Sequence, residues 1–341
     1  MYQSLTQLVE SNQLSAAENL ARQLLSKYPN DGFIWKLLCV SLVRQDKSAH
    51  QELLQATRWL PQDAELHHNL AISCIQNHLS RDAETHFQKA LTINPKSPEV
   101  WMDLAEFYKS SNRLNEALST YQKSLPYLSN PLSALNESAV CFIGLGKYAD
   151  AQKLLTALIE RYPREAPLRS NLAQSYFLQS NYSAAQAQAM CALEISPDEP
   201  TAKRVQILSL SALNNPHEAL RELDRWREQA PVASLPLIAE IYSDFNYPQR
   251  VIECLEQVLK GQALSPAMTL QLADAYLLNS QVSLAYRHFD QCRHFDQTKV
   301  QALVGLSKCA RLEREFTKAS QFIDQALALN PMEINAQIQA G

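Results

Sequence analysis

A short segment, Gly144-Leu-Gly146-Lys147, carries the residue types with which a phosphate-binding loop holds a nucleotide. In that motif backbone N–H groups surround the phosphates, and a lysine followed by serine or threonine completes the site. Here Cys141 stands where the first glycine is required, and Tyr148 follows the lysine. The motif fails at both positions, so we interpret the segment as a turn between two helices.

Histidine and cysteine residues at three places point to a different chemistry, metal binding. His217-Glu218 begins like the helical zinc motif of metalloproteases, but Arg221 stands where the second histidine is needed. His288 and Cys292 are four residues apart, the spacing of two ligands on one helix face. The other residues of these clusters are His67, His68, Cys74, His78 and His294. Because the cysteines fall where small apolar residues recur, we expect core thiols and surface histidines.

Acid–base and nucleophilic chemistry have no local signature in this chain. Carboxylates such as Glu99, Asp103 and Glu106 lie at helical spacing, which a solvated helix face explains better than an acid–base pair. We therefore expect no catalytic residue, no cofactor and no metal, and we interpret these 341 residues as non-catalytic.

The composition limits which classes of binding partner and which cellular compartment we expect. Only 6 glycines argue against glycine-rich nucleotide loops and β-rich folds, and a net charge of −4 argues against nucleic acid. No window is apolar enough for a signal peptide or a transmembrane helix, so no membrane insertion is expected. The 7 cysteines are scattered without a C-x-x-C pair. Free thiols in a reducing compartment, the cytoplasm, fit this pattern best.

The elements that must position these residues are set by an internal repeat. Prolines recur every 32 to 36 residues, at Pro29, Pro61, Pro95, Pro131, Pro163, Pro197 and Pro231. Small apolar residues recur mostly every 34, at Ala49, Ala83, Ala117, Ala151, Ala185, Ala219, Val251, Ala285 and Ala319. Within each unit apolar residues are spaced 3, 4 and 7 apart in two blocks around a polar loop. The spacing predicts two amphipathic helices per unit, stacked into an elongated core.

The repeat resembles the tetratricopeptide repeat (TPR) family over nearly the whole chain. One copy reads His67, Leu70-Ala71, Cys74, Ala83, Phe87, Ala90 and Pro95, and a second reads Trp101, Leu104-Ala105, Tyr108, Ala117 and Tyr121. The resemblance implies an all-α fold, a right-handed α-α superhelix or TPR solenoid of antiparallel helix pairs. The expected array covers 1–331, with units starting near 1, 30, 64, 98, 132, 166, 200, 232, 266 and 300.

The last residues, 332–341, read as the start of an eleventh repeat or as a capping helix. Ala340-Gly341 falls at the Leu-Gly/Ala position of such a repeat. Because arrays usually finish with a polar cap, we expect an N-terminal fragment of a longer protein. A natural terminus with a short cap is the alternative.

In TPR arrays the first helix of each pair lines a concave groove, and the resemblance carries this role to specific positions. The groove residues expected on this basis are Glu65, His68, Asn69, Asp103, Glu106, Asn136, Glu137, Asn171 and Gln174. Later repeats present Arg204, Glu240, Gln271, Asp274, Lys308 and Arg311, a mixed set. Amides and carboxylates suit an extended peptide backbone and Lys or Arg side chains. An ordinary solvated surface is the alternative.

Two functions follow from this interpretation. The first is a non-catalytic scaffold that binds a protein or an extended peptide in its groove. The second is the substrate- or partner-recruiting region of a larger bacterial sulfotransferase or glycosyltransferase, whose catalytic domain lies beyond Gly341. The sequence is compatible with a monomer and with self-association.

Overall fold

The computed structural model describes residues 2–330, and within that range the regular elements are α-helices and two short 3-10 helices. The expected start of an eleventh repeat, 332–341, lies outside the described residues. The chain divides into two compact units, with the division between Pro163 and Arg164. None of the described helices has the length and apolar character needed to cross a membrane.

The first unit contains ten α-helices. They are α1 (Tyr2–Glu10), α2 (Leu14–Lys27), α3 (Gly32–Val43), α4 (His50–Trp59), α5 (Ala64–Gln76), α6 (Ser80–Ile93), α7 (Pro98–Ser110), α8 (Leu114–Ser124), α9 (Leu132–Gly144) and α10 (Tyr148–Arg161). A 3-10 helix, η1 (Leu125–Tyr127), extends α8.

The second unit, as far as residue 330, also contains ten. They are α11 (Ala166–Leu178), α12 (Tyr182–Ile195), α13 (Pro200–Ala212), α14 (Pro216–Gln229), α15 (Leu235–Asp244), α16 (Pro248–Gly261), α17 (Pro266–Leu278), α18 (Val282–Cys292), α19 (Lys299–Leu312) and α20 (Phe316–Leu329). A 3-10 helix, η2 (Val232–Ser234), precedes α15.

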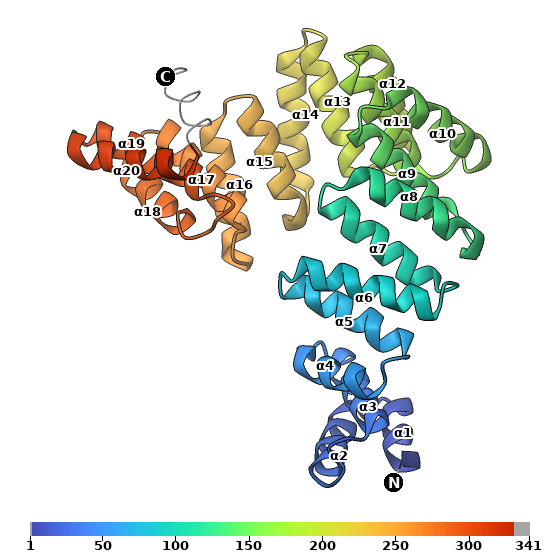
Figure 1. Ribbon diagram of the computed structural model, residues 1–341. Helices are drawn as coiled ribbons and strands as arrows, with labels where there is room; N and C mark the ends of the chain where they lie inside the picture. The colour runs from blue at the N-terminus through green and yellow to red at the C-terminus, as the bar shows by residue number, and fades with distance from the viewer. Residues whose placement is uncertain (1, 331–341) are drawn as a thin grey trace. The chain divides into compact units, whose positions relative to one another are not determined.

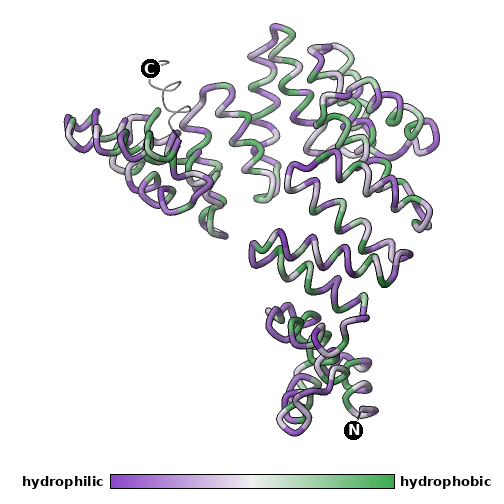
Figure 2. The backbone as a smooth tube through the Cα atoms, viewed as in Figure 1, coloured by the Kyte–Doolittle hydropathy of each residue, from purple (hydrophilic) through white to green (hydrophobic). Residues whose placement is uncertain are grey.

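Within each unit successive helices alternate in direction and pack in chain order (Figure 1). The odd-numbered helix of each pair, its first helix, contacts the even-numbered second helix, which contacts the first helix of the next pair. The predicted all-α array of antiparallel helix pairs is confirmed. Hydrophobic and hydrophilic stretches alternate along the helices (Figure 2), because each helix keeps one face for its neighbours and another for solvent.

The core follows the repeat. Ala83 and Ala285 are fully buried near the starts of their second helices, where a larger side chain would push the paired backbones apart. Phe87 and Phe289, four residues later on the same faces, are fully buried as well. Burying a phenylalanine contributes about 1.5–3 kcal/mol relative to leaving it exposed. The small residue and the aromatic residue therefore form one packing unit that recurs along the chain.

The turn inside each helix pair contains a residue in the left-handed region, two residues before most of the second helices. The residues with positive φ are Asn12, Asp46, His78, Asn112, Gly146, Ser180, Asn214, Asn246, Ser280 and Arg314. The Arg113 N–H donates to the Tyr108 carbonyl (2.8 Å), which closes the end of α7. Only one of these ten positions holds glycine. Asparagine and other residues accept this conformation at a modest cost, which is how a chain so poor in glycine builds ten such turns.

The loops between pairs are fixed by a second recurring contact. The ring N–H of Trp35 donates to the Pro29 carbonyl (2.7 Å), and Trp101 repeats the contact with Pro95 (2.8 Å). Each proline lies two residues after the end of the preceding helix, which it cannot continue. The recurring prolines and the aromatic position of the next first helix thus act together to hold successive pairs in register.

Candidate functional site

The segments that resemble nucleotide or metal motifs have structural roles. Gly146 occupies the turn between α9 and α10 with φ of 70°, as the sequence predicts. In the part of the chain that the structure describes, no three His, Cys, Asp or Glu side chains gather as a metal site would require. Burial raises the pKa of the Cys39 thiol to about 12 and that of Cys292 to about 11. Such thiols stay protonated and are poor nucleophiles.

One histidine pair was missed by the sequence reasoning, which grouped His67 with its neighbours in the chain. Instead His67 on α5 meets His86 on α6, with their Nδ1 atoms 3.0 Å apart and the rings stacked. His67 Nε2 lies 3.1 Å from the Pro61 carbonyl, which can only accept. His67 therefore donates from Nε2 and accepts at Nδ1, and His86 donates from its own Nδ1. Burial, followed by the charge of His67, lowers the pKa of His86 to about 4.

The predicted groove residues of the first unit lie on its first helices, and they contact one another. Lys36 Nζ on α3 contacts Asp63 (2.8 Å) and Glu65 (2.7 Å) at the start of α5. His68 Nε2 on α5 lies 2.7 Å from Asp103 Oδ2 on α7. These contacts join each first helix to the next, because residues at matching positions of neighbouring pairs come side by side.

The same pattern continues to α9. Lys109 Nζ contacts Glu106 (2.7 Å) and Glu137 (2.6 Å), and the amide of Asn136 donates to Glu137 (3.3 Å). The buried Tyr121 donates its hydroxyl to Glu106 (3.2 Å). We call this set of linked side chains from Lys36 to Glu137 the paired row. Its carboxylates are largely neutralised by the protein itself.

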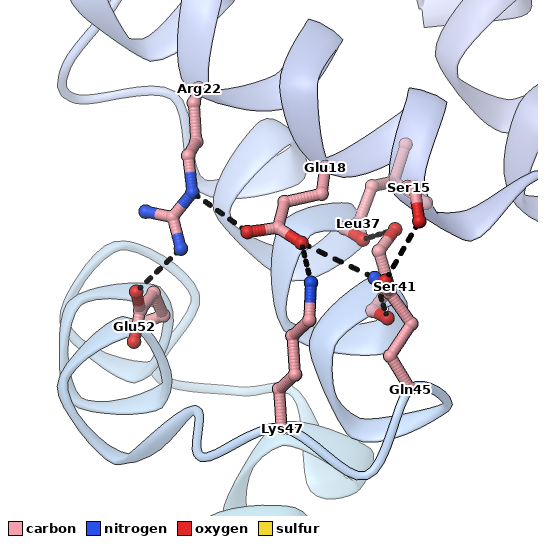
Figure 3. Close-up of polar contacts among 8 residues, drawn as sticks. All are labelled: Ser15, Glu18, Arg22, Leu37, Ser41, Gln45, Lys47 and Glu52. Atoms are coloured by element: carbon pink, nitrogen blue, oxygen red, sulfur yellow. Dashed lines mark hydrogen bonds and ion pairs between the residues drawn. The ribbon is translucent and has the colours of Figure 1, made fainter.

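A polar cluster near the N-terminus extends this behaviour beyond the predicted residues. Glu18 on α2 accepts hydrogen bonds from Lys47 Nζ (2.7 Å), Arg22 Nε (3.1 Å) and Gln45 Nε2 (3.3 Å) (Figure 3). The hydrogen bond from Lys47 is the largest cause of a lowered Glu18 pKa. Lys47 also lines a hollow of about 510 Å³ together with Asn69, a predicted groove residue. The cation at that hollow is therefore already bound by a carboxylate.

The second unit places four of the later first-helix residues, Arg204, Glu240, Gln271 and Asp274, around two adjoining hollows, whereas Lys308 and Arg311 on α19 line neither. The polar hollow, about 560 Å³, is lined by Arg204 on α13, Glu240 and Asp244 on α15, and Gln271 and Asp274 on α17, among others. The apolar hollow, about 190 Å³, is lined by Gln174, Phe177, Leu178, Thr201, Arg204, Val205, Leu208 and Leu237. Arg204 borders both hollows. Of the predicted residues, Gln174 lies at the apolar hollow, and Asn171 lies one turn earlier on α11.

The carboxylates of the polar hollow differ from those of the paired row. Glu240, Asp244 and Asp274 have no ion pair or side-chain hydrogen bond to another described residue. Asp274 is open to solvent, yet the surrounding helices displace much of its water, and this raises the pKa of its carboxyl. Lys308 acts in the opposite direction but is the weaker influence. The arrangement leaves three acidic groups facing one guanidinium.

Known proteins share the repeat and the fold. Two family models, each described as tetratricopeptide repeat, match residues 75–132 and 142–200. The peroxisomal targeting signal receptor of Kluyveromyces lactis is 27% identical over 179 residues, which are 50% of this chain and 31% of the receptor. The crystal structure of yeast Tom70 is 11% identical with a TM-score of 0.54, and the match covers 99% of this chain and 94% of Tom70.

The repeat pattern, the helix pairs and these matches agree. Residues 75–132 and 142–200 match the tetratricopeptide repeat models, and the chain is an all-α array of antiparallel helix pairs like that of tetratricopeptide repeat proteins. The predicted family and fold class are confirmed.

Proposed function

We propose that this chain is a non-catalytic scaffold that binds a protein or an extended peptide on the faces formed by its first helices. The observation that carries the proposal is the polar hollow, where first helices present carboxylates that form no ion pair with another described residue, beside the amide of Gln271, which donates to Ser243. Side chains of this kind can bind a peptide backbone and its polar groups. The relative from Kluyveromyces lactis is by name a receptor for a targeting signal, which supports peptide recognition by analogy.

A peptide array tests this function on the full chain. Capped peptides of random sequence are probed with the wild type and with three variants on first helices, Asn171→Ala and, in the polar hollow, Asp244→Lys and Gln271→Ala. We expect wild-type binding to a subset of peptides and weaker binding by at least one variant. Matched substitutions on exposed positions of second helices, Asn115→Ala, Asp150→Lys and Gln325→Ala, should leave binding unchanged. Absence of any peptide binding, or equal loss in both sets of variants, would contradict the proposal.

All seven cysteines are free thiols, six of them buried, and we infer a reducing compartment such as the cytoplasm. The alternative function, a recruiting region of a larger transferase, stays a prediction about sequence beyond Gly341.

A further inference from the structure

The polar hollow carries an excess of negative charge that the protein does not neutralise. The charged residues of its lining are Glu240, Asp244 and Asp274, against Arg204 alone. Elsewhere in the described residues acidic side chains at comparable positions are bound, as Glu106 is by Lys109. Unpaired carboxylates close together repel one another, and the repulsion is relieved when a cation enters between them. The hollow is therefore complementary to a positively charged group.

Asp274 is the carboxylate of the hollow whose pKa responds most clearly to its surroundings. Its side chain is exposed, but the helices around it remove part of its water, which raises its pKa. Lys308 on α19 lies near enough to oppose the shift, but it makes no ion pair with Asp274. A ligand cation that enters the hollow could form the ion pair with Asp274 that Lys308 does not form.

The adjoining apolar hollow supplies a second requirement. Phe177 and Leu178 from α11, Val205 and Leu208 from α13, and Leu237 from α15 surround it. Leu178 is 46% exposed, so apolar atoms of this hollow are in contact with solvent. Exposed apolar surface of this kind is favourable to cover with a ligand. The hollow, about 190 Å³, has room for one large aliphatic side chain. Covering these atoms would add hydrophobic free energy to binding.

The two hollows adjoin, because Arg204 on α13 lines both. An extended chain advances about 3.3 Å per residue. A single extended peptide can therefore reach adjoining hollows with side chains about three residues apart. A helical or folded partner would have to fit both hollows with a rigid surface, whereas an extended segment adapts to them.

We propose that the two hollows together bind an extended peptide segment that places an aliphatic side chain in the apolar hollow and a lysine or arginine side chain in the polar hollow. This inference rests on the proposed function and specifies its site and its ligand class. Three carboxylates would repel a free C-terminal carboxylate or an acidic side chain, so the segment is internal to its chain and has no acidic side chain next to the basic one. Attraction between the hollow and the basic group weakens as salt screens it.

Synthetic peptides test the inference with the full chain in a fluorescence polarisation titration. The probe is a labelled glycine–serine peptide, blocked at both ends, with a leucine and a lysine three residues apart. Matched probes replace lysine by norleucine or glutamate, or leucine by alanine. We expect the first probe to bind most tightly. Loss of the charge should weaken binding roughly three- to tenfold, and loss of the leucine about tenfold or more.

Variants of the protein locate the binding. Asp274→Asn should weaken the lysine probe severalfold and leave the norleucine probe unchanged, and Leu178→Ala should weaken both. The matched controls Asp324→Asn and Leu329→Ala lie on α20, are exposed, and should bind as the wild type does. Asp274 and Leu178 are both exposed, so neither change threatens the fold, and circular dichroism verifies this.

The outcomes separate this inference from the proposed function. If random peptides bind to first-helix faces while the leucine–lysine probe does not, the ligand class is wrong and the scaffold function stands. The site is wrong if the probe binds but Asp274→Asn and Leu178→Ala have no effect. If no peptide of either set binds, both proposals fail.

Discussion

The first helices of the two units present similar residue types but opposite states of pairing. In the first unit Glu106 and Glu137 share the ammonium of Lys109, and Asp103 is bound by His68. In the second unit Glu240 and Asp274 face a hollow without a partner. A surface that has satisfied its own charges gains little from a ligand, because each new contact replaces an existing one. The comparison points to the second unit as the region with more to gain from binding.

The strongest test of pairing in the first unit uses its buried histidines. The pKa of His86 is about 4, below its ordinary 6.5, and that of His67 is lowered too. As pH falls from about 6.5 to 4, these histidines bind protons in the unfolded chain but not in the folded one. The free energy of unfolding therefore falls over this window. For His86 the loss amounts to roughly 3 kcal/mol. Lys89 and His50 oppose protonation, and Asp82 favours it.

Hydrogen exchange of the α5 and α6 amides, corrected for intrinsic rates, measures this loss. His86→Leu should flatten the pH dependence, and the exposed His294→Leu should keep the wild-type behaviour. Equal losses in wild type and His86→Leu would mean that the histidine pair is not the cause.

The difference between the two units can be assigned to surface charge only if their cores are equally well packed. Substitution of Gly305 tests the core packing of the second unit. A Cβ atom added there would overlap the ring of Phe289, which is fully buried. We expect Gly305→Ala to destabilise the protein by about 1–3 kcal/mol. Gly261, with open space around it, is the control, and Gly261→Ala should be neutral or slightly stabilising. Urea unfolding of both variants decides, and a tolerated Gly305→Ala would indicate a loosely packed second unit.

A variant of the first unit can imitate the second. Lys109→Met leaves Glu106 and Glu137 without their cation, which should cost about 1–2 kcal/mol because Lys109 is partly buried. The same change creates an unpaired acidic surface, so the lysine-bearing probe should gain affinity for the first unit. Lys123→Met, at an exposed position of α8, is the control for loss of a positive charge. If the variant gains no affinity, pairing is not what distinguishes the two surfaces.

The repeat made the helices predictable, because apolar residues at spacings of 3, 4 and 7 specify helices and a 34-residue period specifies their pairing. The turns were less accessible: the left-handed residue is Ser180, although the sequence suggested only a loop near Asn181. The pairing of first-helix residues could not be predicted in full. Glu106 and Asp274 occupy the same position in their units.

The two positions differ in whether a cationic side chain lies close by on the same helix. Lys109 follows Glu106 by three residues, a spacing that brings the side chains together on a helix, whereas Leu277 follows Asp274. That local signal was readable from the sequence. The contacts of Lys109 with Glu137 and of His67 with His86 join different helices, so they depend on how the pairs stack, which periodicity alone does not specify.

The smallest expected effect is the change in stability when one first-helix aspartate in each unit is replaced by asparagine. Asp103→Asn weakens the contact with His68 and should cost a few tenths of a kcal/mol, since Asp103 is partly exposed. Asp274→Asn removes an unpaired charge whose pKa is raised by partial loss of water, and it should stabilise the protein by a similar amount or less at pH 7. Because the pKa of Asp274 is raised in the folded chain, its gain must shrink as acid protonates the wild-type carboxyl. Hydrogen exchange of α7 and α17 at pH 7 and pH 4 measures both effects, and two changes of equal sign would mean that the two carboxylates are in equivalent environments after all.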